Sequence, residues 1–185
     1  MRIISGMKRG CPIAAPRGKN TRPTYDKVRE ALFGIIQFEI ADKDVLDLFA
    51  GSGALGLEAL SRYAKSALFN DSSRESIAAI RSNIEKLGFA DRAEVLSMDY
   101  ARAIEQAAYR GRRFDIVFLD PPYASGLIEP AMEKLIECRA LNEGFLIVAE
   151  HHEKFPPKAG EAFALRSAKR YGETALSFFV EGERA

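Results

Sequence analysis

The stretch VLDLFAGSGALG, residues 45–56, joins an apolar run to a glycine-rich loop and then to the start of a helical pattern. The run from Val45 to Phe49 predicts a short buried strand. Gly51, Gly53 and Gly56 match the spacing G-x-G-x-x-G, which is typical of a strand–loop–helix unit that binds a nucleotide-like cofactor. This unit decides the fold class, because strands and helices alternate on from it along most of the chain.

Hydrophobic periodicity predicts the other elements. Helical patterns cover residues 25–38, with Thr24 as the expected N-cap, and residues 54–64, 73–88, 100–110 and 126–141. Strand patterns cover residues 2–6, 66–70, 92–98, 114–120 and 144–151, and residues 163–180 read as two strands around a turn at Tyr171–Glu173. Strands that alternate with helices indicate an α/β protein with a mostly parallel sheet, here with an antiparallel C-terminal hairpin.

Bulk composition is that of one α/β domain with a small extension. The chain has 185 residues, of which 47% are hydrophobic, and no apolar run approaches the roughly 18 residues of a membrane span. Cys11 and Cys138 have no metal-ligand spacing, and the neighbouring His151 and His152 would point to opposite faces of a strand. We expect a reduced, cytoplasmic monomer without a metal, with an extension at residues 1–23 and the main domain at residues 24–185.

Positive charge is concentrated at the N-terminus. Residues 1–30 carry a formal charge of +6, whereas the whole chain carries only +1. A basic extension on a mildly acidic body suggests contact with a polyanion, although a solvated tail would have the same composition.

Acidic residues around the glycine loop distinguish between two cofactors. Asp71 lies twenty residues after Gly51, so the spacing alone permits NAD. Asp47 lies four residues before Gly51, where it would repel the pyrophosphate of NAD and attract the sulfonium and ammonium groups of S-adenosylmethionine. The charge pattern favours S-adenosylmethionine, and the alternative role of Asp47 is to cap the following helix.

Two further acids are candidate cofactor ligands. Asp71 is expected to accept hydrogen bonds from the ribose hydroxyls, and Asn70 is its rival because a one-residue shift exchanges them. Asp99 suits either the adenine amino group or the N-cap of the helix that begins near Tyr100. The predicted cofactor contacts are Asp47, Phe49, Gly51, Ser52, Gly53, Asp71 and Asp99.

A second motif, FLDPPYASG at residues 118–126, places Asp120 at the end of an apolar strand. In open α/β sheets, ligands bind outside the carboxyl ends of the strands. A carboxylate and a backbone carbonyl there would accept both N–H bonds of an exocyclic amine and turn its delocalised lone pair toward a methyl donor. Prolines hold such acceptors rigid, and an aromatic ring stacks on a base. The predicted catalytic group is therefore Asp120, Pro121, Pro122 and Tyr123; the alternative is a strand-ending turn.

Together, VLDLFAGSGALGLEALSR and FDIVFLDPPY resemble the class I S-adenosylmethionine-dependent methyltransferases that modify amines. Three further stretches narrow the resemblance to the 16S rRNA guanine-N2 methyltransferase family of the RsmD type: RGKNTRPTYDKVREALF near the N-terminus, EH at residues 150–151, and KRYGETALSFF near the C-terminus. The resemblance extends over almost the whole chain. This resemblance implies a Rossmann-like, seven-stranded sheet with a small N-terminal β-hairpin extension. It also implies methyl transfer to the N2 of a guanine in 16S rRNA within small-subunit particles. This chain departs from the family pattern at Asp71, where the family commonly has Glu.

Basic residues at both ends of the chain are candidate RNA ligands for such an activity. A target guanine has to leave its stack to enter a pocket, while cationic side chains hold the phosphates around it. The predicted RNA contacts are Arg9, Arg17, Lys19 and Arg22 in the extension, and Lys169 and Arg170 in the hairpin.

Other functions share parts of this pattern. N6-adenine DNA methyltransferases have the same amine clamp, but 185 residues leave little room for their target-recognition region. Glutamine methyltransferases typically begin the clamp with Asn, whereas this chain has Asp120. A non-catalytic RNA-binding assembly factor would have the fold without turnover.

Overall fold

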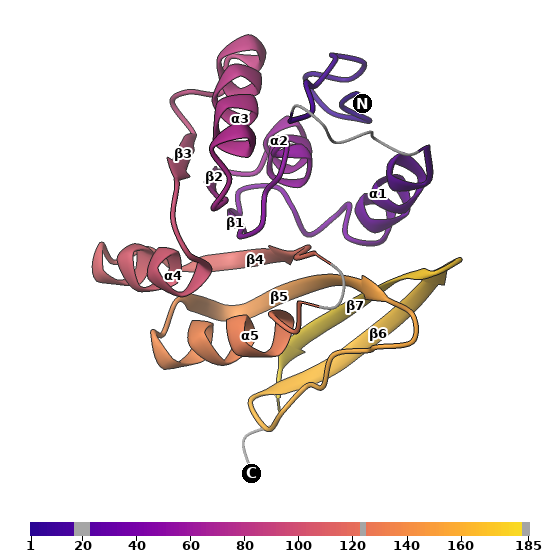
Figure 1. Cartoon of the computed structure of the whole chain (residues 1–185), viewed down its shortest axis with the longest axis vertical. Helices are drawn as coiled ribbons and strands as arrows, with labels where there is room; N and C mark the ends of the chain where they lie inside the picture. Colours follow the sequence, from indigo (N-terminus) through magenta and orange to yellow (C-terminus); the bar gives the residue numbers. More distant parts are fainter. Residues whose placement is uncertain (17–22, 123–124, 183–185) are drawn as a thin grey trace.

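A computed structural model describes residues 1–16, 23–122 and 125–182 of the chain. Within them, one sheet holds seven strands in the order β3-β2-β1-β4-β5-β7-β6 (Figure 1). The strands are β1 (Asp44–Asp47), β2 (Ser66–Asn70), β3 (Ala93–Leu96), β4 (Phe114–Leu119), β5 (Leu141–His152), β6 (Phe163–Tyr171) and β7 (Thr174–Glu181). The helices are α1 (Pro23–Ile35), α2 (Ala54–Ser61), α3 (Arg74–Leu87), α4 (Tyr100–Tyr109) and α5 (Ile128–Glu137).

The predicted alternation of strands and helices is confirmed, with differences at the boundaries. Gly88 closes α3 with a φ of 69°, as its lack of a β-carbon permits. Thr24 was wrong as an N-cap, because α1 already begins at Pro23, whose fixed φ suits the first helical position. The predicted strand at residues 2–6 is only an isolated bridge between Arg2 and Pro12, and Leu141 belongs to β5 rather than to the preceding helix.

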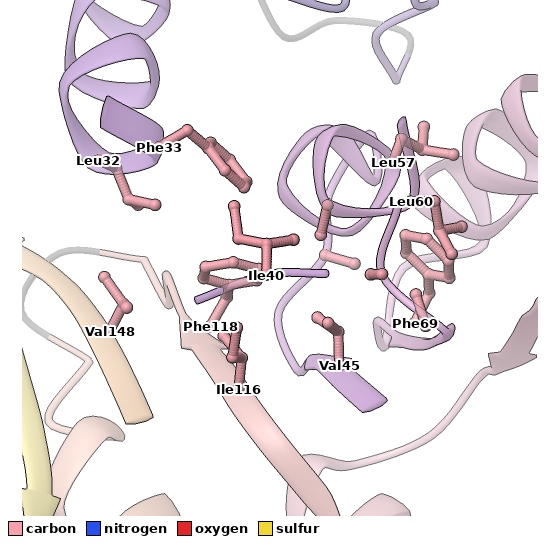
Figure 2. Close-up of a cluster of buried hydrophobic side chains, with 14 of the residues drawn as sticks. Leu32, Phe33, Ile40, Val45, Leu57, Leu60, Phe69, Ile116, Phe118 and Val148 are labelled. Atoms are coloured by element: carbon pink, nitrogen blue, oxygen red, sulfur yellow. The ribbon is translucent and has the colours of Figure 1, made fainter. Parts of the chain in front are cut away.

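Side chains of β4 alternate between the two faces of the sheet. Ile116 and Phe118 face a cluster that includes side chains of α1, α2 and α3, while Val117 and Leu119 face a second cluster that includes side chains of α4 and α5. On the first face, the rings of Phe33 and Phe118 lie 5.6 Å apart (Figure 2). Helices thus cover both faces, as a buried parallel sheet requires. No helix in the described part of the chain is long and apolar enough to cross a membrane.

Strand direction determines which ends meet. β1 pairs in parallel with β2 on one side and with β4 on the other, so the carboxyl ends of these strands share one edge. β7 lies between β5 and β6 and is antiparallel to both. The C-terminal hairpin therefore enters the sheet with its second strand innermost.

Residues 1–16, the N-terminal segment, pack onto the first face of the sheet beside α2 and α3. Ile3 and Ile13 are 1% and 5% exposed and belong to the same core cluster as the strands. Backbone bonds between Ile3 and both Gly10 and Cys11 fold the segment back on itself. The division of the chain near residue 23 stays a prediction, but the N-terminal segment shares its core with the main domain.

A buried carboxylate anchors this segment to α2. Glu58 is fully buried and accepts hydrogen bonds from the backbone N–H groups of Ile4, at 2.7 Å, and Ser5, at 3.0 Å. It also pairs with Arg62 Nε at 2.8 Å. Next to it, Ser61 Oγ accepts from the Lys8 N–H and donates to the Ser5 carbonyl. Buried charges persist where such partners compensate for lost hydration.

Replacing Glu58 with Ala should unfold the protein more easily, because two backbone N–H groups and a guanidinium would lose their common acceptor. Breaking a buried pair in this way costs about 3–5 kcal/mol. Urea unfolding measures the loss, with Glu133→Ala on the exposed face of α5 as the control. A Glu58→Ala stability within about 1 kcal/mol of wild type would contradict the anchoring role.

Candidate active site

Four neighbouring strands carry the polar residues selected from the sequence. In sheet order, Asp99 follows β3, Asp71 follows β2, the glycine loop (residues 50–53) follows β1, and Asp120 follows β4. Parallel pairing along this row brings all four strand ends to one edge. Between β1 and β4 the chain order of the strands reverses, which is where open α/β sheets bind their ligands.

Three glycines in this loop and helix have different tasks. Gly51 and Gly53 have positive φ values of 56° and 79°, which residues with a β-carbon rarely adopt. A β-carbon on Gly51 would meet no atom within 4 Å, so this position faces open space. A β-carbon on Gly56 would lie 2.3 Å from the ring of Phe69, so this glycine lets α2 pack closely on β2.

Asp47 is buried beneath the loop, with 2% of its surface exposed. Its Oδ2 accepts a hydrogen bond of 2.9 Å from the Gly56 N–H in the first turn of α2. Burial, opposed by that bond and reinforced by nearby Asp71, raises the pKa of Asp47 to about 7. The contact seen is the helix-capping one that the sequence left open, and the attraction of a cationic cofactor by Asp47 stays a prediction.

Asn70 and Asp71, which the sequence could not separate, have distinct positions. Asn70 is 1% exposed, and its Nδ2 donates to the carbonyls of Leu48 and Met98, each at 3.2 Å. It thereby ties together the chain segments that leave β1 and β3. Asp71 is only half-buried, and its two oxygens accept from the Gly51 and Ser73 N–H groups, each at 2.8 Å. Asp71 is therefore the better ribose candidate.

Beyond the acids, two rings lie over this edge. The ring of Phe49, after β1, lies 5.9 Å from that of Tyr100, at the start of α4. Asp99 Oδ1 accepts from the Ala101 N–H at 2.9 Å, so it caps α4, the second of the two roles considered for it. Tyr100 was not selected from the sequence, where a lone Tyr at a helix start carries no signal.

The predicted amine clamp is only partly within the described residues. Asp120 is half-buried at the end of β4, Pro121 is buried, and the exposed Pro122 accepts a hydrogen bond of 3.1 Å from the Ser125 N–H. Tyr123 lies outside the described residues. Glu150, which was not among the site residues selected from the sequence, follows Ala149, the partner of Leu119 in β5. Continuing that register puts Glu150, 8% exposed, beside Asp120 on the same face.

Of the predicted RNA contacts, Arg9, Lys169 and Arg170 lie within the described residues. Arg9 is exposed in the N-terminal segment, and Lys169 and Arg170 are exposed on β6. Arg170 is paired with Glu153 and donates to the Gly172 carbonyl. Arg17, Lys19 and Arg22 lie outside the described residues, so their contacts stay predictions.

His151 has a structural environment. Its Nε2 lies 2.9 Å from Ser177 Oγ and its Nδ1 2.9 Å from the His152 carbonyl oxygen, and burial lowers the pKa of the ring. Across the described ranges, no three His, Cys, Asp or Glu side chains group as metal ligands, and Cys11 and Cys138 are free thiols.

Known proteins share this arrangement over the whole chain. A family model described as conserved hypothetical protein 95 matches residues 1–180. Ribosomal RNA small subunit methyltransferase D of Escherichia coli (strain K12) is 37% identical over 180 residues, which cover 97% of this chain and 89% of that protein. The chain belongs to the RsmD family of S-adenosylmethionine-dependent methyltransferases. The solved structure of the Escherichia coli protein yhhF is 35% identical with a TM-score of 0.87, covering 100% of this chain and 99% of that one.

S-adenosylmethionine is the cofactor of the RsmD family, in agreement with the charge argument against NAD. A solved structure of SMU.776, a protein complexed with SAH (S-adenosylhomocysteine), has the same fold, with a TM-score of 0.68. It is 18% identical, and the match covers 86% of this chain and 50% of that one. The residues present fit the cofactor. Gly51 faces open space, Asp71 and Asp47 bind backbone N–H groups of the loop and of the helix that follows it, and residues 45–56 contain no lysine that would balance a pyrophosphate.

Changing Asp47 to Asn should alter how stability depends on pH. Because burial raises the pKa of Asp47 from 3.8 to about 7, the native state keeps a proton that the unfolded chain releases between these values. The contribution of this group to stability therefore falls as the pH rises through that window and levels off above it. Between about pH 5 and about pH 8, the free energy of unfolding of the wild type should fall by up to about 3 kcal/mol relative to that of the variant. Urea unfolding at the two pH values measures this difference. Parallel pH curves for the two proteins would refute the buried titration.

Proposed function

We propose that this protein transfers a methyl group from S-adenosylmethionine to the exocyclic N2 of a guanine in 16S rRNA of the small ribosomal subunit. The observation that carries the proposal is the pairing of β1 with β4, which puts the glycine loop next to Asp120 and its two prolines. A methyl-donor loop and an amine-binding motif thus share one edge of the sheet.

In this proposal the chain's own groups orient the amine. S-adenosylmethionine supplies an electrophilic methyl group when it is bound. The Asp120 carboxylate accepts a hydrogen bond from one N–H of the guanine N2 amine. This bond holds the amine in an orientation in which the nitrogen lone pair is less delocalised into the ring. We assign the second acceptor to the Pro121 carbonyl, because the Pro122 carbonyl already accepts from the Ser125 N–H. Tyr123 stacks on the flipped base and limits its rotation.

Support for an RNA substrate comes from the relatives and from charge. The Escherichia coli relative is named as a methyltransferase of small-subunit ribosomal RNA. In this chain, Arg9 in the N-terminal segment, the basic residues Arg17, Lys19 and Arg22, and Lys169 and Arg170 on β6 provide cations for phosphate groups. We therefore propose that the substrate is a small-subunit particle, whose folded RNA offers phosphates around an accessible guanine.

Labelled methyl transfer tests the proposal. The protein is incubated with methyl-labelled S-adenosylmethionine and small-subunit particles that lack the modification, followed by nucleoside analysis and mapping of the labelled nucleotide. Free 16S rRNA, large subunits and duplex DNA are the comparison substrates. N2-methylguanosine from the small-subunit particle is the expected product. Labelled N6-methyladenosine, or binding of the particle with no transfer, would favour the alternative functions.

Changing Asp120 to Ala should nearly abolish methyl transfer and leave cofactor affinity unchanged. Orientation of the amine matters most in the transition state, so we expect turnover to fall by about 10²–10⁴-fold. Asp120→Asn, which keeps one oxygen acceptor, should retain more activity than Asp120→Ala. Single-turnover kinetics and calorimetry with SAH measure the two quantities. Turnover of Asp120→Ala within about threefold of wild type would disprove the clamp.

Replacing Arg17, Lys19 and Arg22 together with Ala should weaken particle binding and leave SAH affinity unchanged. Each lost phosphate contact flattens the plot of log affinity against log salt by roughly 0.7–0.9, so the slope should decrease by about 2–3.

A matched control removes the same charge elsewhere. Arg110, Arg113 and Arg139 are exposed near the opposite edge of the sheet, at the end of α4 and before β4 and β5. Their replacement with Ala should change the slope little. An unchanged slope in the first triple variant, with a fall in SAH affinity, would show that these residues order the cofactor pocket instead.

A further inference from the structure

Asn83 is a buried polar residue on the apolar face of α3, between Ile80 and Ile84, and is 1% exposed. Its side-chain amide makes three hydrogen bonds. Oδ1 accepts from the Ala14 N–H at 2.8 Å, and Nδ2 donates to the Ala14 carbonyl at 2.9 Å and to the Ser52 carbonyl at 3.0 Å. A single side chain therefore satisfies both backbone groups of Ala14 and one backbone group of Ser52.

These partners belong to two different functional parts of the molecule. Ser52 lies between Gly51 and Gly53 in the cofactor loop. Ala14 is near the end of the N-terminal segment, three residues before Arg17, which is proposed to hold RNA together with Lys19 and Arg22. All three partner atoms are backbone atoms, so Asn83 constrains the path of the chain at both places and not only the side chains.

The N-terminal segment has little freedom to move independently of the cofactor loop. Besides Asn83, it is held by Glu58 and Ser61 on α2, and α2 begins directly after Gly53. Breaking the Asn83 contacts would leave the buried side-chain amide of Asn83 and the carbonyl of the buried Ser52 without their partners, which is costly. A shift of the loop at Ser52 is therefore transmitted to Ala14.

We propose that Asn83 is a positioning residue that couples cofactor binding to RNA capture. By holding Ser52 and Ala14 together, it lets an occupied cofactor loop stabilise the N-terminal segment, which leads into residues 17–22. This inference rests on the proposed function for the role of those residues. Coupling between two sites is reciprocal, so RNA binding must strengthen cofactor binding by the same factor.

Hydrogen exchange tests the link without RNA or activity. In wild type, adding SAH should slow amide exchange in the glycine loop and also in residues 1–16. In Asn83→Ala, SAH should protect the loop but not residues 1–16. Leu135→Ala, fully buried on the opposite face of the sheet in α5, is the control for general destabilisation and should keep protection in both regions.

Binding to small-subunit particles gives the coupling factor, which is the ratio of the particle affinity with SAH to that without it. Particle affinity is measured with and without saturating SAH, and SAH affinity with and without particles. We expect SAH to tighten wild-type particle binding by about fivefold or more, as is typical of coupled sites, and by less than about twofold in Asn83→Ala. If Asn83→Ala does not fold, Ala14→Pro serves instead, because it removes the N–H donor to Asn83 and leaves Asn83 in place.

The outcomes separate this inference from the proposed function. A wild-type factor near one, or a factor retained in the variants, overturns the coupling even if guanine methylation is normal. If Asn83→Ala loses thermal stability but keeps both the coupling factor and the SAH protection of residues 1–16, then Asn83 has a structural role only. This result also overturns the proposal. Wild-type protein that neither binds nor methylates particles overturns the proposed function, and with it the coupling.

Discussion

The parallel pairing of β1 between β2 and β4 is the constraint on which the candidate site depends. Asp47 is in register with Phe69 on one side and Phe118 on the other, so three strand ends lie level. A shift of one residue would turn the side chains of β1 to the opposite face, which the apolar clusters on both faces forbid. The distance between the glycine loop and Asp120 is thus set by core packing, and not by the loops themselves.

Buried polar residues hold this edge together. Asp47 binds the first turn of α2, Asn70 joins the segments leaving β1 and β3, and Asn83 joins the glycine loop to the N-terminal segment. Burying such groups is unfavourable unless hydrogen bonds replace their hydration, and each has at least one partner here. Because these partners are backbone groups, the polar residues determine the shape of loops that apolar contacts would leave variable.

Acidic residues near the loop hold backbone groups of the loop and of the helices that follow it. Asp71 and Asp99 already accept backbone hydrogen bonds that shape the loop and cap α4. A carboxylate has about four acceptor positions, so these bonds leave capacity for ligand groups. Asp47 differs, because it is buried and its pKa is raised to about 7. Its charge thus depends on pH and on any cation that binds above it.

The sequence by itself determined the alternation of strands and helices, the glycine loop and the order of the polar motifs, because these depend on local periodicity and on residues with special backbone geometry. It also indicated the cofactor, since acids beside the loop conflict with a pyrophosphate. It could not choose between Asn70 and Asp71 as the ribose candidate, because the difference in their burial appears only in the fold. Only the tertiary structure decided that Glu58 and Asn83 anchor the N-terminal segment and that Leu119 and Ala149, the residues before Asp120 and Glu150, pair in the sheet. These contacts join residues far apart in the chain, and no local pattern records which distant backbone groups a buried polar side chain will meet.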